Sequence, residues 1–107
     1  MIKIRIFLLF FVFTSLYAVN VKYHGQVDLE NGNFVEYDLK PSSFVKEIHF
    51  DSTNNYLITR LNQTYYHYCR INQIVVSNWV NSSSLGRFYN SEIKGNYDCR
   101  LGGIPQY

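Results

Sequence analysis

The sequence is poor in the residues that most nucleotide-binding and metal sites need. Its 107 residues include six glycines, three histidines, two cysteines and two prolines. No glycine-rich phosphate loop is present, so neither a P-loop nor a dinucleotide-binding fingerprint is expected. The chain also lacks internal repeats, low-complexity tracts and obvious linkers. These absences predict a single domain without a nucleotide cofactor.

The placement of the few candidate ligands disfavours metal and hydrolase sites. His24, His49 and His67 have no ligand spacing with one another or with the acidic residues. A structural zinc site needs four convergent ligands, so we expect no metal site. The serines at 82–84 have no histidine beside them, whereas serine hydrolysis needs a nucleophile, a base and an orienting acid. We therefore expect no cofactor and no catalytic residue, and we predict that the protein is not an enzyme.

Long apolar runs are absent as well, and a shorter one stands near the N-terminus. Two basic residues precede an apolar run at 6–13, which falls well short of the roughly 20 residues that a membrane-spanning helix needs. Ala18 offers a small exit residue, so residues 1–18 are typical of a secretory signal peptide, although Leu16 stands where a smaller residue is usual. An uncleaved signal anchor is the alternative. We predict export to the periplasm or secretion, with no stable membrane span after cleavage.

Net charge is absent once the signal peptide is removed. The full chain has ten lysines and arginines against eight acidic residues, and Lys3 and Arg5 leave with the signal. Residues 19–107 thus carry eight charges of each sign, which disfavours nucleic acid as a partner. Residues 19–51 hold three basic and six acidic groups, and residues 52–107 hold five and two. The two parts either attract each other or leave a basic face on the second.

The two cysteines, Cys69 and Cys99, allow only one pairing. An even count in an exported chain predicts a disulfide, and small exported domains often supplement a thin core in this way. On the loop-entropy model, such a bond would stabilise the fold by roughly 3–4 kcal/mol. The alternative is a reactive Cys69 thiol that is activated by His67.

Turn residues divide the middle of the chain into strands. Residues 26–39 alternate in polarity around an Asn31-Gly32 pair, which predicts a hairpin. Three further apolar-rich segments are separated by short polar turns: 44–50, 56–61 and 64–71. Their composition and turns predict three meander strands.

Beyond residue 72 the apolar residues follow a helical period. Those of a first predicted helix are Val75, Val76, Trp79 and Val80. Those of a second, shorter helix are Leu85, Phe88 and Tyr89. Ser84 can cap this second helix and Gly95 can end it. The predicted class is α+β: a small antiparallel sheet, made of the N-terminal hairpin and the three meander strands, packed against two short C-terminal helices.

Two aromatic motifs and a serine pair give the chain a family likeness. The central motif is Tyr-x-Tyr at Tyr66 and Tyr68, and the closing motif SLGRFYNSEIKGNY begins at Ser84. The matching residues are Ser42, Ser43, Tyr66, Tyr68, Ser84, Gly86, Phe88, Tyr89, Asn90 and Ile93. Over roughly residues 42–97, the chain resembles the KTSC domain, a module named for the C-terminus of some lysyl-tRNA synthetases.

The chain departs from that family around the central motif. Many members carry glycine before the motif and Val-Pro after it, where this sequence has Thr64 and Ile71-Asn72. The cysteines in YYHYC and YDCR resemble those of an exported single-domain subgroup. The resemblance implies no catalytic residue, and RNA binding has been suggested for the family.

The segment TYYHYC concentrates the candidate binding residues. Alternation along a strand places Tyr66 and Tyr68 on one face. Their neighbours on the other face are Tyr65, His67 and Cys69. The Tyr66/Tyr68 face either packs on the first helix as core or lies open as a stacking surface for bases.

Basic and polar residues complete the candidate surfaces. For nucleic acid, the residues expected to hold phosphates are Arg60, Arg70 and Arg87. A polar ligand pocket is the second candidate, around Ser84, Asn90 and Lys94. Structurally, Ser84 and Asn90 are expected to satisfy backbone groups at helix ends, and Gly86 to permit a close approach of the last helix to the sheet.

We predict a small exported, non-catalytic binding or interaction module. Its expected partner is an unknown protein or glycan of the cell envelope. Binding of single-stranded RNA through Tyr66 and Tyr68 is one alternative, and inhibition of a periplasmic enzyme is another.

Overall fold

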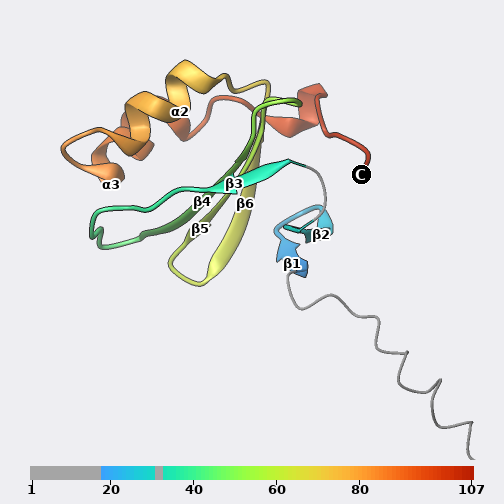
Figure 1. Ribbon diagram of the computed structural model, residues 1–107, viewed down its shortest axis with the longest axis horizontal. Helices are drawn as coiled ribbons and strands as arrows, with labels where there is room; N and C mark the ends of the chain where they lie inside the picture. Colours follow the sequence, from blue (N-terminus) through green and yellow to red (C-terminus); the bar gives the residue numbers. More distant parts are fainter. Residues whose placement is uncertain (1–17, 31–32) are drawn as a thin grey trace, which may run out of the picture.

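A six-stranded sheet with two short helices on one face makes up the part of the chain that the computed structural model describes, residues 18–30 and 33–107 (Figure 1). The strands are β1 (Ala18–Val21), β2 (Gly25–Asp28), β3 (Phe34–Glu36), β4 (Val45–Asp51), β5 (Tyr56–Leu61) and β6 (Thr64–Cys69). Across the sheet they stand in the order β2-β1-β6-β5-β4-β3. The helices are α2 (Gln73–Val80) and α3 (Leu85–Phe88). The predicted α+β class is confirmed.

Two sequence predictions fall largely outside the described residues. The predicted signal peptide at 1–18 lies outside the described residues except for Ala18, which begins β1. The Asn31-Gly32 pair at the centre of the predicted hairpin does so as well. Within residues 18–30 and 33–107, no helix is long and apolar enough to cross a membrane.

The N-terminal hairpin is formed by other strands than those predicted. β2 pairs antiparallel with β1, whereas β3 pairs antiparallel with β4. β2 and β3 lie at opposite edges of the sheet, so the prediction that residues 26–39 form one hairpin is wrong. The physical reason is a competing short hairpin, because β2 pairs with β1 across the turn at 22–24 and Val27 is buried there opposite Val19. β1 is an additional strand, and its parallel pairing with β6 makes the sheet mixed.

The three predicted meander strands are confirmed as β4, β5 and β6. Asp51 shapes the turn after β4, where its Oδ1 accepts a hydrogen bond from the amide of Thr53 at 3.0 Å. β5 and β6 are joined by a two-residue turn in which Asn62 has a φ of 54°. Such a turn closes on a hydrogen-bonded pair of residues, here Leu61 and Thr64.

Apolar residues are buried on both faces of the sheet. The cluster between the sheet and the helices contains Val45, Ile48, Phe50, Leu57, Ile71, Val76, Trp79, Leu85, Tyr89 and Ile93. The cluster on the opposite face contains Val21, Val27, Tyr56, Ile58, Cys69 and Cys99. That second face is covered by the β1–β2 hairpin and the C-terminal tail (Figure 1).

Both predicted helices are confirmed, and side chains cap them. The Oδ1 of Asn72 accepts a hydrogen bond from the amide of Val75 at 3.0 Å and so caps α2. The Oγ of Ser84 accepts from the amide of Arg87 at 3.2 Å and so caps α3, as predicted. α3 continues as a π-helix over Tyr89–Ile93.

A close contact at Gly86 positions α3 against the core. A Cβ added at this position would stand 2.7 Å from Cε1 of Phe44, the residue before β4. The predicted close approach is confirmed, and the neighbour is this aromatic ring. The indole Nε1 of Trp79 also donates to the carbonyl of Leu85 at 3.0 Å, which joins α2 to α3.

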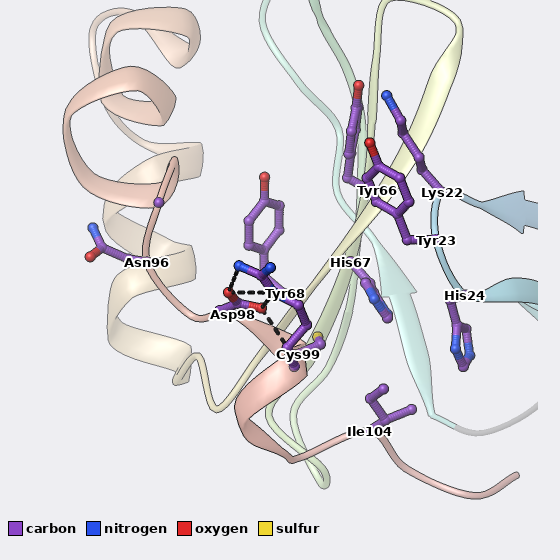
Figure 2. Close-up of a pocket in the computed structure, with 12 residues that line it drawn as sticks. Lys22, Tyr23, His24, Tyr66, His67, Tyr68, Asn96, Asp98, Cys99 and Ile104 are labelled. Carbon is purple, nitrogen blue, oxygen red and sulfur yellow. Dashed lines mark hydrogen bonds and ion pairs between the residues drawn. The ribbon is translucent and has the colours of Figure 1, made fainter.

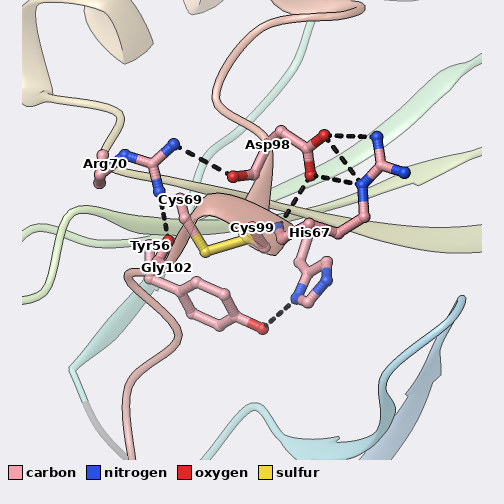
Figure 3. Close-up of a disulfide and its surroundings, with 8 residues drawn as sticks. Tyr56, His67, Cys69, Arg70, Asp98, Cys99 and Gly102 are labelled. Carbon is pink, nitrogen blue, oxygen red and sulfur yellow. Dashed lines mark hydrogen bonds and ion pairs between the residues drawn. A yellow bond between two sulfur atoms is a disulfide. The ribbon is translucent and has the colours of Figure 1, made fainter.

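A disulfide fastens the C-terminal tail to the end of β6 (Figure 3). Cys69 and Cys99 are bonded as predicted, and both are buried. The amide of Cys69 also donates to the carbonyl of Tyr97 at 2.8 Å. Beyond this bond the tail forms a short 3₁₀ helix, Cys99–Leu101. Because both cysteines are bonded, the alternative of a reactive Cys69 thiol is wrong.

Removing the disulfide is expected to cost much of the stability. The bond spans a sequence separation of 30 residues. Replacing both cysteines (Cys69→Ala with Cys99→Ala) should lower the free energy of unfolding by roughly 3–4 kcal/mol, because the unfolded chain gains freedom. Urea unfolding of the oxidised and the substituted protein measures the difference. A loss below about 1 kcal/mol would contradict this account.

Gly86→Ala is expected to destabilise the protein although alanine favours helices by about 1 kcal/mol. The new methyl group meets the Phe44 ring, so we expect a net loss of about 1–3 kcal/mol in urea unfolding. Phe44→Leu removes the ring atoms in contact and serves as the background for a double-mutant cycle. On that background, Gly86→Ala should cause no loss; an equal loss in both backgrounds would refute the steric explanation.

Candidate binding cleft beside strand β6

The edge of β6 that faces β1 is covered only at its two ends. Among the described residues, β1 pairs with β6 only through Val21 and Tyr65. The amide of Lys22 then donates to the carbonyl of Tyr65 at 2.8 Å. At the other end of β6, the tail contact between Cys69 and Tyr97 covers the strand. Between these two contacts the edge lies open.

A cleft of about 640 Å³ lies along this open edge (Figure 2). Its volume falls within the roughly 300–1,000 Å³ that is usual for ligand sites. The walls come from the turn after β1, from β6 and from the C-terminal tail. The lining includes Lys22, Tyr23, Tyr66, His67, Asp98 and Ile104.

Tyr66 and Tyr68 share one face of β6, as predicted, but have different surroundings. Tyr68 packs against the helix-side core, and its hydroxyl lies 2.6 Å from the hydroxyl of Tyr89. Burial and this hydrogen bond raise the pKa of Tyr68 well above its ordinary value. Tyr66 lines the cleft near Lys22 instead. Tyr68 therefore belongs to both core and cleft wall, whereas Tyr66 belongs to the cleft.

Lys22 lies close to two aromatic rings at one end of the cleft (Figure 2). Its ammonium is 5.1 Å from the ring centre of Tyr23 and 5.6 Å from that of Tyr66, which permits cation–π attraction. Tyr23 is 92% exposed and has a φ of 66°, which is unusual for an aromatic residue. Across the described part of the chain, no acidic side chain forms an ion pair with Lys22.

His67 lies on the other face of β6, and two neighbours hold its ring (Figure 3). Its Nδ1 is 2.8 Å from the hydroxyl of buried Tyr56, and the ring centre of His24 is 4.9 Å away. Burial, with repulsion from His24, lowers the pKa of His67 to about 4. The ring is therefore neutral at neutral pH. When Nδ1 accepts the Tyr56 proton, Nε2 carries the hydrogen and is a donor.

Asp98 and Arg100 form the wall on the tail side. The guanidinium of Arg100 donates to both carboxylate oxygens of Asp98. Its Nη2 donates to Oδ2 at 2.7 Å, and its Nε donates to Oδ2 at 3.0 Å and to Oδ1 at 3.1 Å. These hydrogen bonds lower the pKa of Asp98 to about 2. Its charge is thus compensated within the tail itself.

The remaining predicted binding residues do not line the cleft. Arg60 forms an ion pair with Glu47 at 2.7 Å. Arg70 donates to the backbone carbonyls of Asp98, at 3.1 Å, and Gly102, and so holds the tail (Figure 3). The others are Ser84, which caps α3, Arg87 within α3, and Asn90 and Lys94 after it. The structure therefore does not bring the predicted phosphate-binding arginines together with Tyr66.

A second polar cluster stands on the sheet face away from the helices. Ligating atoms of Glu36, Glu47 and His49 lie within 4.8 Å of one another, a proximity that the sequence spacing does not indicate. The carboxylate of Glu47 already accepts hydrogen bonds from Arg60 at 2.7 Å and Tyr65 at 2.9 Å. Burial would raise the pKa of Glu47, but its hydrogen bonds lower it. We interpret the cluster as an internal ion-pair network.

Several cleft residues are missed by sequence reasoning. Lys22, Tyr23 and His24 lie in a segment for which no element is predicted, and Asp98 and Arg100 lie in a tail that is interpreted as irregular. The available signal is the cysteine pair, because a bond from the end of β6 to the tail places residues near position 99 beside that strand.

Comparison with known proteins concerns the central part of the chain. The family model described as the KTSC domain matches residues 41–97, which is more than half of the sequence. A crystal structure of a KTSC domain protein from Yersinia pestis is similar with a TM-score of 0.56 and 26% identity, covering 61% of this chain and 92% of that one. Among curated proteins, none matches.

Acidification is expected to weaken the fold through His67. An imidazole in the unfolded chain has a pKa of about 6.5, against about 4 here. The unfolded state therefore binds the proton more readily, so this contribution is present above about pH 6.5 and is lost as the pH falls toward 4. Between about pH 7 and pH 4.5, Tm should fall further for the wild type than for His67→Gln. Equal falls, or a His67 ring that titrates near 6.5 by NMR, would contradict this.

Proposed function

This chain belongs to the KTSC domain family, and on that premise we propose that it is a small exported binding module whose ligand site is the cleft beside β6. One observation carries the proposal: β6 lies open between Tyr65 and Cys69, and a cleft of about 640 Å³ lies along the opening. A concave site with aromatic walls and a few polar groups is the usual form of a ligand site.

The chemistry of the cleft supports binding rather than catalysis. Its cysteine, Cys99, is bonded to Cys69 and is no nucleophile. His67 is neutral and hydrogen-bonded to Tyr56, and Asp98 is hydrogen-bonded to Arg100. The two side chains therefore do not form the pair of a general base and its orienting acid that a catalytic triad contains. The aromatic rings and Lys22 supply contact area and charge for a ligand.

Export is supported by the disulfide and by the N-terminal sequence. Disulfides persist mainly in oxidising compartments, and residues 1–18 have the charged start, apolar run and small exit residue of a signal peptide. Mass spectrometry of the mature protein should find an N-terminus at Val19 and no free thiol. A chain that retains Met1 and has two free thiols would refute export.

A matched pair of lysine variants tests the cleft as the ligand site. Lys22→Glu reverses the charge inside it, whereas Lys94→Glu makes the same change outside it. Capture of partners from envelope fractions should fall about tenfold for Lys22→Glu and for Tyr66→Ala, because few residues dominate a site. Lys94→Glu should retain capture. Equal loss in both lysine variants would point to general charge and away from the cleft.

Single-stranded RNA is the second candidate ligand, and the position of Lys22 over the Tyr66 ring favours it. The closure of Tyr68 against Tyr89 opposes it, since one stacking ring of the predicted pair is packed in the core. Titration with labelled oligouridine at two salt concentrations separates the candidates. Affinity that falls with salt and is lost in Tyr66→Ala would favour RNA; absence of binding would remove this candidate.

A further inference from the structure

Hydrogen bonding between β5 and β6 alternates along β6. The turn between them closes on the pair Leu61 and Thr64. Antiparallel strands bond through every second residue, so the residues directed toward β5 are Thr64, Tyr66 and Tyr68. The residues directed toward the opposite edge are Tyr65, His67 and Cys69.

At that opposite edge, the backbone of His67 has no partner among the residues that the structure describes. The carbonyl of Tyr65 accepts from Lys22, and the amide of Cys69 donates to Tyr97, each at 2.8 Å. No residue in the described part of the chain bonds to the amide or the carbonyl of His67 at this edge. Backbone groups in native proteins are nearly always paired with protein, water or ligand. One free donor and one free acceptor therefore face the cleft, side by side.

The opening has the length of a short extended segment. Tyr65 and Cys69 are four residues apart, which corresponds to roughly 13 Å along a strand. The backbones at Lys22 and Tyr97 limit it at each end. A chain that enters the opening therefore pairs with β6 through His67 alone and leaves the sheet on both sides.

The two faces of the opening suit the alternating side chains of such a segment. Tyr66 and Tyr68 stand on one side of β6, and the His67 ring and Ile104 on the other (Figure 2). Successive side chains of an extended chain point to opposite faces. One ligand side chain would meet tyrosine rings and the next would meet His67 and Ile104.

The charge at the opening favours an acidic ligand. Lys22 has no acidic partner in the described residues, and its ammonium lies at the cleft wall. The carboxylate of Asp98 is compensated by Arg100. The uncompensated charge that a ligand meets is therefore positive and stands at the Lys22 end.

We propose that the cleft binds a short extended peptide segment of a partner protein, which pairs its main chain with the amide and carbonyl of His67 and places an acidic side chain against Lys22. The inference rests on the proposed function and names the ligand class of that site. Addition of a strand to an open sheet edge is a recurrent mode of peptide recognition, in which main-chain bonds give affinity and side-chain pockets give specificity.

Peptide display selects a ligand directly from a pool of random sequences. A library of nine-residue peptides on phage is panned on the purified oxidised protein, with the Lys22→Glu variant as counter-selection. We expect enriched peptides to contain aspartate or glutamate and to lack proline at the pairing position, since proline has no donor. Failure of every peptide to bind the wild type better than Lys22→Glu would overturn the proposal.

NMR then tests the main-chain pairing itself. Titration of the enriched peptide should shift the amides of Tyr66 and His67, and hydrogen exchange of the His67 amide should slow about tenfold. N-methylation of the pairing residue in the peptide removes its donor and should weaken binding roughly tenfold. The matched Lys94→Glu variant should bind as the wild type does. Unchanged affinity after N-methylation would overturn the proposal.

Failure of this inference and failure of the proposed function give different results. If peptides leave the resonances of Lys22 and Tyr66 unshifted while oligouridine or a soluble glycan shifts them, the cleft is a ligand site of another class and the peptide inference falls. If none of these three probes shifts the resonances of Lys22 and Tyr66, both the peptide inference and the proposed function are refuted.

Discussion

The bond between Cys69 and Cys99 sets the position of the C-terminal tail, and much of the protein depends on that position. The part of the tail beside the cleft has little apolar anchoring, since Leu101 is 77% exposed and Ile104 is 40% exposed. Only at its far end does Tyr107 pack against the rings of Phe34 and Tyr56. The disulfide, the Cys69–Tyr97 hydrogen bond and the hydrogen bonds from Arg70 hold the part of the tail beside the cleft. The tail in turn closes one end of the β6 edge. These bonds therefore fix the tail as one wall of the cleft.

Burial on both faces of the central strands explains why a small chain needs that link. The helices cover one face with a large cluster around Trp79, whereas the other face is covered only by the short β1–β2 hairpin and the tail. The disulfide lies inside this thinner second cluster, beside Tyr56. The same enclosure keeps the ring of His67 neutral, because its burial and the nearby His24 oppose a positive charge. Stability and the electrostatics of the cleft therefore have a common cause.

Features that follow from local residue spacing or from the cysteine count could be predicted from the sequence. The two faces of β6 follow from strand alternation, α2 follows from its spacing of three and four, and the disulfide follows from cysteine parity. Which strands pair depends on the partners that compete for each segment. Asn31-Gly32 favours a hairpin turn, yet the segments on its two sides pair with β1 and β4. The cleft is missed for the same reason, because an open edge depends on where β1 turns away from β6.

Most of the family's motif residues build the frame, and few of them touch the cleft. Tyr68 meets Tyr89 through their hydroxyls, which joins the central motif to the closing one, and Gly86 accommodates Phe44. Of the motif residues, Tyr66 and Tyr68 line the cleft.

Most of the other lining residues lie in 22–24 and 98–104, which flank the matched segment 41–97 on either side, whereas His67, Gly95 and Asn96 lie within it. The shared frame thus presents a strand edge and two tyrosines, while the flanks add Lys22 and the Asp98–Arg100 pair. If the cleft binds a peptide, the main-chain contact at His67 requires only the frame, whereas the choice of ligand depends on the flanks. Relatives that keep the frame and differ in their flanks would then recognise different ligands at the same edge.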